Sequence, residues 1–207
     1  MTPEEFAAAA DVSRETLARL REMDRVLMDW SSRHNLIARS TMEARWFRHY
    51  LDSAQIAPLL PGGIRRLVDL GSGGGFPGLV LAAILAEKNV HVTLIESTGK
   101  KAAFLAAAGE AMGLANLRVI PARIESVTLP APPDIVTARA LARLDKLLGY
   151  IHGIQGKTTR ALLLKGQDVE VELTEAAKSW HMDVKRHKSL TSPDATLLEI
   201  SGLRPLT

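Results

Sequence analysis

Residues 68–78 read Val-Asp-Leu-Gly-Ser-Gly-Gly-Gly-Phe-Pro-Gly, and this glycine-rich stretch sits at the end of a short apolar run. Its glycines allow the backbone to turn tightly and to approach a ligand where any Cβ atom would collide. The flanking residues predict a buried strand over Leu67–Leu70 and a helix over Leu79–Glu87. A glycine loop between a strand and a helix predicts a site for a nucleotide-like ligand.

Two registers of the glycine pattern compete in this loop. Residues 73–78 match the dinucleotide pattern GxGxxG, whereas residues 71–75 match the GxGxG pattern of S-adenosylmethionine-dependent methyltransferases. Asp69 favours the second register, because a carboxylate there can meet the cationic amino-acid part of S-adenosylmethionine but repels a pyrophosphate. Pro77 weakens the first register, since pyrophosphate binding uses free amides at the helix start. A tight turn that binds no ligand is the remaining alternative.

A second carboxylate supports nucleoside binding without distinguishing the two ligands. Glu96 closes the next expected strand, about 20 residues past the loop, where an acidic side chain accepts hydrogen bonds from ribose hydroxyls. Both ligand classes use this arrangement.

The pattern around the loop predicts an α/β fold. From Arg65 onward, short apolar runs alternate with helical stretches, which is typical of βαβ units and a mainly parallel sheet. A further helix is expected from Asp168 to about Lys178, and the last two strands are expected to pair antiparallel. We therefore expect a Rossmann-like methyltransferase fold with a C-terminal antiparallel hairpin. The expected strands are Leu67–Leu70, Val90–Glu96, Leu117–Pro121, Ile135–Arg139, Leu162–Lys165, Met182–His187 and Thr196–Ser201.

The N-terminal residues predict helices instead of strands. A threonine cap at Thr2, with proline and glutamate after it, begins a short first helix. Apolar residues then recur at spacings of three and four over Ser13–Trp30, which predicts one face of an amphipathic helix. A third helix is expected from Ser40 to about Pro58. Residues 1–60 are thus expected to form a helical cap, and residues 61–207 the ligand-binding core.

Composition bounds the remaining possibilities. A chain of 207 residues with 46% hydrophobic side chains can bury a substantial core. It contains no cysteine, which excludes disulfides, thiolate metal sites and thiol nucleophiles. No apolar run approaches the roughly 20 residues of a membrane span, and the N-terminus is acidic where a signal peptide is basic. We expect a cytoplasmic protein with no metal requirement, no membrane association and a monomeric state.

Several short motifs, in order along the chain, resemble the GidB (RsmG) family. These proteins methylate a guanosine of small-subunit ribosomal RNA at the position-7 nitrogen. The resemblance covers residues 35–166. Besides the glycine loop, it rests on Asn35-Leu36-Ile37, His49 with Asp52-Ser53, Glu96-Ser97-Thr98-Gly99-Lys100-Lys101, Phe104-Leu105, Arg123-Ile124-Glu125, Thr137-Ala138-Arg139-Ala140 and Leu164-Lys165-Gly166.

The resemblance implies S-adenosylmethionine as the cofactor and a set of residues that contact it. Glu96 is expected to hold the ribose, Phe76 to lie against an apolar part of the ligand, and Ile124-Glu125 to bracket the adenine. The expected cofactor-binding residues are Asp69, Gly71, Ser72, Gly73, Gly75, Phe76, Glu96, Ser97, Thr98, Ile124, Glu125 and Arg139.

Methyl transfer to guanine N7 uses a ring lone pair that carries no proton at neutral pH, so no general base is required. Alignment of the reactants should dominate the rate. The candidate catalytic residues are Arg139, to orient the guanine or the cofactor carboxylate, and Lys165, to hold RNA phosphate. His49 is expected to pack against the core or cap a helix, not to bind metal.

The expected partner is ribosomal RNA, within the small ribosomal subunit or an assembly intermediate. Only 4% of residues are aromatic, so recognition by shape and phosphate fits better than broad base stacking, and binding should weaken steeply with salt. The alternatives are a methyltransferase for a small metabolite, a dinucleotide oxidoreductase and a non-catalytic S-adenosylmethionine-binding module. Candidate phosphate contacts are Arg39, Arg45, Arg48, Lys100, Lys101, Arg123, Arg143 and Lys146.

Overall fold

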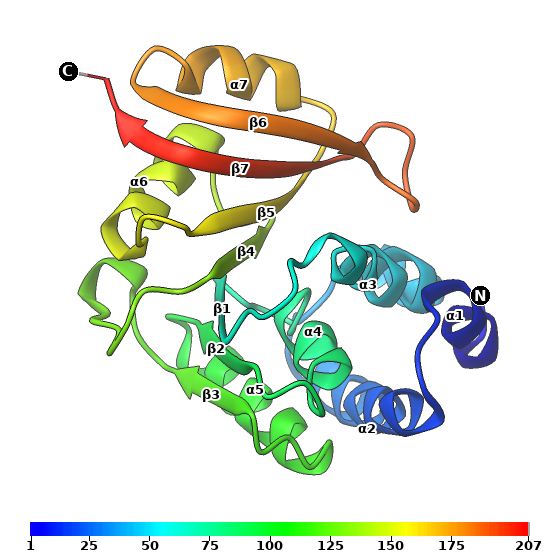
Figure 1. The fold of residues 1–207 in the computed structure, drawn as a ribbon. Coiled ribbons are helices and arrows are strands. Elements are labelled where there is room, and N and C mark those ends of the chain that lie inside the picture. Colours follow the sequence, from blue (N-terminus) through cyan, green and yellow to red (C-terminus); the bar gives the residue numbers. More distant parts are fainter. Residues whose placement is uncertain (207) are drawn as a thin grey trace.

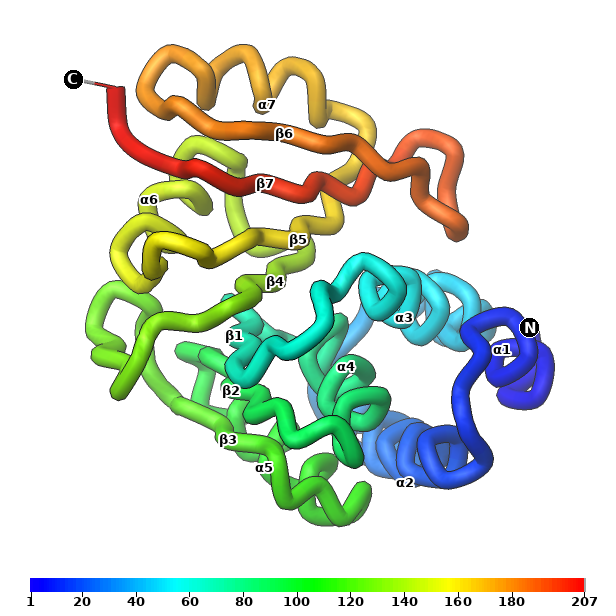
Figure 2. Tube along the Cα trace, viewed as in Figure 1, coloured from blue at the N-terminus to red at the C-terminus, as the bar shows by residue number. Residues whose placement is uncertain are grey.

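A single seven-stranded sheet organises the computed structural model, which describes residues 1–206 (Figures 1 and 2). Its strand order is β3-β2-β1-β4-β5-β7-β6, and β7 runs antiparallel to both of its neighbours while the other pairs are parallel. The expected α/β fold with a C-terminal hairpin is confirmed. The strands are β1 (Arg66–Leu70), β2 (His91–Ile95), β3 (Leu117–Ile120), β4 (Ile135–Arg139), β5 (Arg160–Lys165), β6 (Trp180–Lys188) and β7 (Thr196–Pro205).

Helices cover both faces of this sheet. On one face, α4 (Gly78–Ile84) and α5 (Gly99–Ala111) pack with the N-terminal helices in one hydrophobic core. On the other face, α6 (Leu144–Ile154) and α7 (Val169–Ala176) form a second core. The central strands β1, β4 and β5 are covered from both sides, and every residue of theirs except those at the strand ends is buried.

The N-terminal helices pack directly on the sheet. Helix α1 (Pro3–Ala10) begins with the expected Thr2 capping box, and α2 (Arg14–Ser31) buries its stripe of Leu20, Met23, Val26 and Leu27. Residues of the first 60 share one core with strands β1 and β2. The expected boundary at residue 60 therefore separates an all-helical segment from the part of the chain that contains the sheet, and the two share one core.

The expected helix from Ser40 to about Pro58 is confirmed in its middle and wrong at both ends. An unbroken helical segment comprises the π-helical η2 (Trp46–Leu51) and α3 (Asp52–Ala54), with the 3-10 turns η1 (Arg39–Thr41) before it and η3 (Ala57–Leu59) after it. No helix begins at Ser40. The neighbouring Thr41 hydroxyl donates to the Ala38 carbonyl and contacts His49, so it does not cap a helix either. Several other elements differ from expectation only at their ends, with α4 stopping at Ile84 and β6 and β7 extending further.

A close approach between the cap and the glycine loop explains one glycine. A Cβ atom at Gly74 would lie 2.7 Å from the Leu36 carbonyl oxygen and 3.3 Å from an Ile37 methyl group. The backbone of the Asn35-Leu36-Ile37 segment therefore lies directly against the loop. Because the Leu36 contact is with backbone, it cannot be relieved by a rotamer change.

We expect Gly74→Ala to lower the free energy of unfolding by about 1–3 kcal/mol, the usual cost of overpacking a filled contact. Urea unfolding of both proteins measures this difference. Gly62→Ala is the matched control, since Gly62 has no atom within 4 Å of its Cβ position and needs no positive φ. Equal stability of the two variants would contradict the close approach.

Candidate active site

The glycine loop and the ends of β2 and β3 enclose a pocket of about 310 Å³ at the carboxyl edge of the sheet. Parallel α/β sheets bind their ligands at this edge. Six of the expected cofactor residues line the pocket, and Lys101, Arg123 and Tyr150 complete its rim. The six are Gly71, Gly73, Glu96, Ser97, Ile124 and Glu125.

Glu96 ties the loop to the end of the second strand. Its two carboxylate oxygens accept hydrogen bonds from the Gly73 amide (2.9 Å) and from the Thr98 amide (2.7 Å). The side chain is only 6% exposed, so its orientation is fixed by these two amides. Each oxygen keeps a further lone pair that can accept a hydroxyl from the pocket. Thr98 thus contributes to the site through its backbone.

Asp69 does not reach this pocket, contrary to expectation. Its side chain is completely buried beneath the loop, where one oxygen accepts a hydrogen bond from the Thr137 hydroxyl at 2.7 Å. The other oxygen has no hydrogen-bond partner among residues 1–206. Burial raises the pKa of Asp69 to about 6, although the nearby Ser72 hydroxyl, the hydrogen bond from Thr137 and the charge of Arg139 oppose the rise. Asp69 supports the loop from below instead of facing a ligand.

Three other loop residues are also buried under the turn. Ser72 donates its hydroxyl to the Asp69 carbonyl, and Gly75 donates its amide to the Ser72 carbonyl. Phe76 is 4% exposed and packs edge-on against Tyr50, with ring centroids 5.0 Å apart. Phe76 therefore faces the cap, so the structure does not place its ring in the pocket of about 310 Å³.

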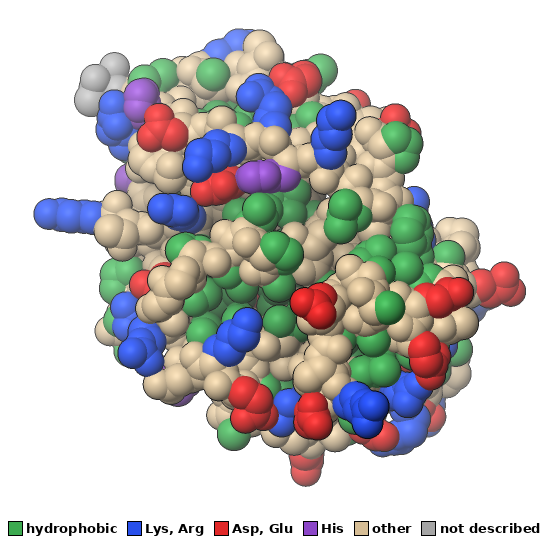
Figure 3. Space-filling view, turned by 45° about the vertical axis from the view of Figure 1, so that its right-hand side comes forward, with side chains coloured by type: hydrophobic (Ala, Val, Ile, Leu, Met, Phe, Trp, Pro, Cys, Tyr) green, Lys and Arg blue, Asp and Glu red, His purple; other side chains and the backbone are tan. Residues whose placement is uncertain are grey.

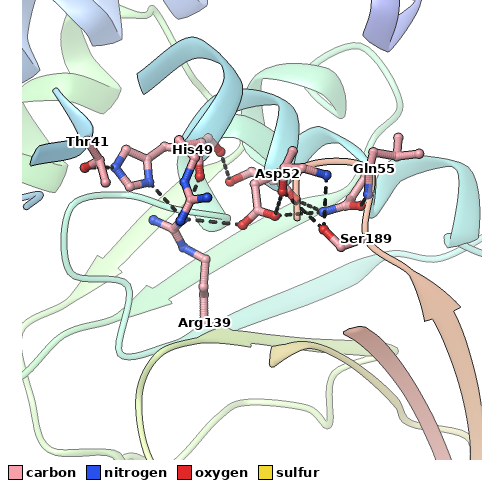
Figure 4. Close-up of polar contacts among 10 residues, drawn as sticks. Thr41, His49, Asp52, Gln55, Arg139 and Ser189 are labelled. Carbon is pink, nitrogen blue, oxygen red and sulfur yellow. Dashed lines mark hydrogen bonds and ion pairs between the residues drawn. The ribbon is translucent and has the colours of Figure 1, made fainter. Parts of the chain in front are cut away.

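The guanidinium of Arg139 lies over the Phe76 ring, 5.3 Å from its centroid (Figure 4 shows its polar contacts). Its Nη1 donates to His49 Nδ1 at 2.9 Å and lies within 3.4 Å of Asp52 Oδ2 and 3.3 Å of the Arg48 carbonyl. Within residues 1–206, Nη2 and Nε form no hydrogen bond. One edge of Arg139 is thus held by the cap, while the other edge is open.

The contacts of His49 determine its tautomer. Arg139 can only donate, so His49 Nδ1 must accept and the ring proton lies on Nε2. Nε2 donates to the Thr41 hydroxyl at 2.8 Å, and that hydroxyl donates to the Ala38 carbonyl. Burial and the charges of Arg139 and Arg48 lower the pKa of His49 to about 4. His49 is therefore neutral at physiological pH and packs in the core, as expected.

Asp52 joins three distant parts of the chain at this point (Figure 4). Besides Arg139 on β4, its carboxylate accepts hydrogen bonds from the Thr191 hydroxyl at 2.6 Å and from the Gln55 amide at 2.9 Å. Gln55 in turn accepts from the Leu190 amide. Thr191 and Leu190 lie in the loop between β6 and β7, so Asp52 links the cap, a central strand and the C-terminal hairpin.

Sequence reasoning did not identify the roles of Asp52 and Thr191. The Asp52-Ser53 pair belongs to the motifs of the resemblance, which was the available signal. Thr191 has no local signal, because it is brought to Asp52 only by the pairing of β6 and β7.

A second pocket of about 540 Å³ adjoins the first. The two pockets share Ala140 and Leu141, which form the wall between them. Ala140 has a φ of 51°, in the left-handed region that residues with a Cβ atom rarely adopt. A Cβ atom added to Gly71 would collide with Leu141, so the wall lies directly against the loop. Arg139, Arg143, Lys165, Asp168 and Glu172 line the second pocket.

Lys165 is already paired inside this second pocket. Its ammonium lies 2.6 Å from Glu172 Oε2 and donates to the Ala142 carbonyl at 3.0 Å, and its side chain is 10% exposed. Glu172 also accepts from the Leu144 amide. Lys165 is therefore not a free cation for RNA phosphate in this structure; it fixes the 142–144 segment against β5 and α7.

The described residues show neither a metal cluster nor a membrane helix. Within residues 1–206, no group of three or more His, Cys, Asp or Glu side chains is arranged to hold a metal ion. No helix in the same part of the chain is long and apolar enough to span a bilayer.

The fold is that of the S-adenosylmethionine-dependent methyltransferases. A solved SAM-dependent methyltransferase from Aquifex aeolicus matches with a TM-score of 0.59 and 15% identity, covering 76% of this chain and 92% of that one. Two curated relatives named ribosomal RNA small subunit methyltransferase G are 46% identical. The protein from Paramagnetospirillum magneticum aligns over 97% of this chain and 95% of its own, and that from Rhodospirillum rubrum over 98% of each.

The chain belongs to the GidB family, described as rRNA small subunit methyltransferase G, whose model matches residues 16–199. This confirms the resemblance read from the short motifs, and it identifies the chain as a methyltransferase.

Two buried groups, Asp69 and His49, should change the pH dependence of stability in opposite directions. The raised pKa of Asp69 means that the folded protein retains a proton that the unfolded chain releases, so its contribution falls as pH rises from about 4 to 6. The lowered pKa of His49 acts in the opposite sense, and its contribution rises with pH from about 4 to 6.5.

We therefore expect Asp69→Asn to gain up to about 3 kcal/mol in free energy of unfolding, relative to the wild type, between pH 4 and pH 7. His49→Gln should lose stability relative to the wild type over the same range. Urea unfolding at several pH values measures both curves. Curves that run parallel to that of the wild type would show that neither group is perturbed.

Proposed function

We propose that this protein transfers the methyl group of S-adenosylmethionine to the position-7 nitrogen of a guanosine in small-subunit ribosomal RNA. The observation that carries the proposal is the pair of adjoining pockets, one built on the glycine loop and Glu96 and the other open to the surface beside it. The names of the 46% identical relatives support ribosomal RNA as the substrate. We further propose that the protein acts in the cytoplasm, where ribosomal RNA is the substrate, and that it acts as a monomer.

The first pocket fits a nucleoside cofactor. Glu96 offers its remaining lone pairs to ribose hydroxyls, and Ile124 presents apolar surface for the adenine ring. Gly71 and Gly73, which line this pocket, have positive φ angles of 65° and 53°, and glycine adopts this conformation without strain. When bound, S-adenosylmethionine supplies an electrophilic methyl carbon.

We assign Arg139 an orienting role. Its Nη1 is fixed by His49 and Asp52, so its open edge projects from a rigid base toward the second pocket. A guanidinium edge suits either the carboxylate of the cofactor or an acceptor atom of the guanine. Since N7 already has a free lone pair, the protein supplies alignment, and well-oriented reactants gain up to about 7–11 kcal/mol in this way.

Phosphate contacts are assigned to basic residues at the rims of the two pockets and on the cap. Arg143 lines the second pocket, Arg123 and Lys101 line the first, and Arg48 is exposed on the cap. Arg45 is removed from this group, because it forms a bidentate pair with Asp24. On the face shown in Figure 3, Lys and Arg side chains are spread among acidic ones and form no single patch, which fits distributed contacts along RNA.

The decisive experiment is methyl transfer from labelled S-adenosylmethionine to purified small subunits that lack the modification. We expect one labelled guanosine, methylated at N7, when the RNA is digested and analysed by mass spectrometry. Label found on a small metabolite would favour a small-metabolite methyltransferase. S-adenosylmethionine binding in calorimetry without any methyl transfer would favour a non-catalytic binding module. Tighter binding of NAD than of S-adenosylmethionine would favour a dinucleotide oxidoreductase.

Glu96→Gln should weaken S-adenosylmethionine binding by about 10–100-fold. A glutamine has only one side-chain oxygen, so its NH2 group must face either the Gly73 or the Thr98 backbone amide. Two hydrogen-bond donors then face each other, which displaces the loop and leaves that backbone amide without an acceptor. Calorimetry with the cofactor measures the affinity. Glu110→Gln on the exposed surface of α5 is the control and should bind normally. Unchanged affinity in Glu96→Gln would exclude the ribose role.

A further inference from the structure

The second pocket has two distinct ends. Its near end is the Ala140-Leu141 wall that it shares with the cofactor pocket. Its far end is formed by residues 166–168, which follow β5, and by Ala195, which precedes β7, because β5 and β7 lie on the side of β4 away from β1 and the glycine loop. A base bound here with its reacting atom toward the shared wall has its opposite edge toward residues 166–168.

Three carboxylates line this pocket, and two of them already hold other parts of the fold together. Asp52 accepts hydrogen bonds from Thr191, Gln55 and Arg139, and Glu172 is held by Lys165 and the Leu144 amide. The positions of the Asp52 and Glu172 carboxylates are therefore explained by contacts within the fold.

Asp168 is the third carboxylate, and it has no such explanation. Within residues 1–206 its side chain forms no hydrogen bond and no ion pair, although it immediately precedes α7 and could have capped that helix. Asp and Asn usually occupy this position because they accept from the first free amides. Here the carboxylate is exposed at the far end of the pocket with both oxygens free.

A free carboxylate in this place matches one edge of guanine. Guanine presents two adjacent donors, N1–H and the 2-amino group, on the edge opposite the five-membered ring that carries N7. A carboxylate accepts both in parallel, as it does from a guanidinium. Adenine has an unprotonated N1 and no 2-amino group, so the same carboxylate repels it. Enzymes that modify a single base commonly read its Watson–Crick edge in this way.

We propose that Asp168 is the residue that selects guanine, by accepting hydrogen bonds from N1–H and the 2-amino group of the target base. The proposal rests on the proposed methylation of guanosine, and it deepens that function by naming the atoms that are read. With N7 toward the cofactor and the Watson–Crick edge on Asp168, the base spans the pocket from its near end to its far end. Arg139 at the near end and Asp168 at the far end then fix the base in its plane.

The test uses reconstituted small subunits that carry either guanosine or inosine at the methylated position. Inosine keeps N7 and N1–H but lacks the 2-amino group, so it removes one of the two proposed hydrogen bonds. We expect kcat/KM of the wild type to be about 10–100-fold lower for inosine, the usual effect of one hydrogen bond to a charged group. Asp168→Ala should lower kcat/KM for guanosine strongly and bring the guanosine to inosine ratio close to one.

Two further measurements separate this role from a structural one. Asp168→Ala and the milder Asp168→Asn should keep the wild-type affinity for S-adenosylmethionine and the wild-type Tm. Asp145→Ala is the matched control, an exposed aspartate in the first turn of α6, and it should keep the wild-type guanosine to inosine ratio.

Either of two results would overturn the inference. The first is an Asp168 variant that retains the wild-type guanosine to inosine ratio. The second is a variant that loses cofactor affinity or Tm in proportion to its loss of activity. A wild-type protein that methylates no guanosine at all is a different result, and it contradicts the proposed function itself.

Discussion

The contact between Asp52 and Arg139 holds the functional edge of this protein together. It joins the N-terminal cap to β4, and through Thr191 it also joins the C-terminal hairpin. The Arg139 and Asp52 side chains are 20% and 13% exposed, and removing either partner from such a largely enclosed pair destabilises the protein, because the remaining charge loses its compensation. Arg139 is also the residue to which we assign the orienting role in the proposed reaction. In that proposal the cap is part of the active edge, since His49 and Asp52 hold the Arg139 guanidinium.

The buried acid under the loop shows how the cofactor pocket is kept rigid. Asp69 has no direct route to a ligand, but it accepts from Thr137 and lies under the turn close to Gly78, where a Cβ atom would be 2.7 Å from its carboxylate. Glu96 fixes the same turn from above through the Gly73 amide. Two acids thus shape the loop, and only the second faces the pocket.

Local patterns predicted the strands, the glycine loop and the position of Glu96 because each depends on residues close together in the sequence. The depth of Asp69 and Phe76 could not be predicted, since it depends on how the cap packs against the loop. The start of the third cap helix was mispredicted because Thr41 and His49 use their polar groups for contacts that a helix pattern does not show. The link from Asp52 to Thr191 spans 139 residues, and no local signal indicates it.

In the proposed reaction, the cofactor and the target base bind against opposite sides of one shared wall. Ala140 and Leu141 border both cavities, and the backbone at Ala140 is already in an unfavourable conformation. Any displacement of these two residues by one ligand changes the cavity offered to the other. Thermodynamic reciprocity then requires that each ligand alter the affinity of its partner by the same factor. In the proposed reaction, the same two residues thus border the sites of both the methyl donor and the methyl acceptor.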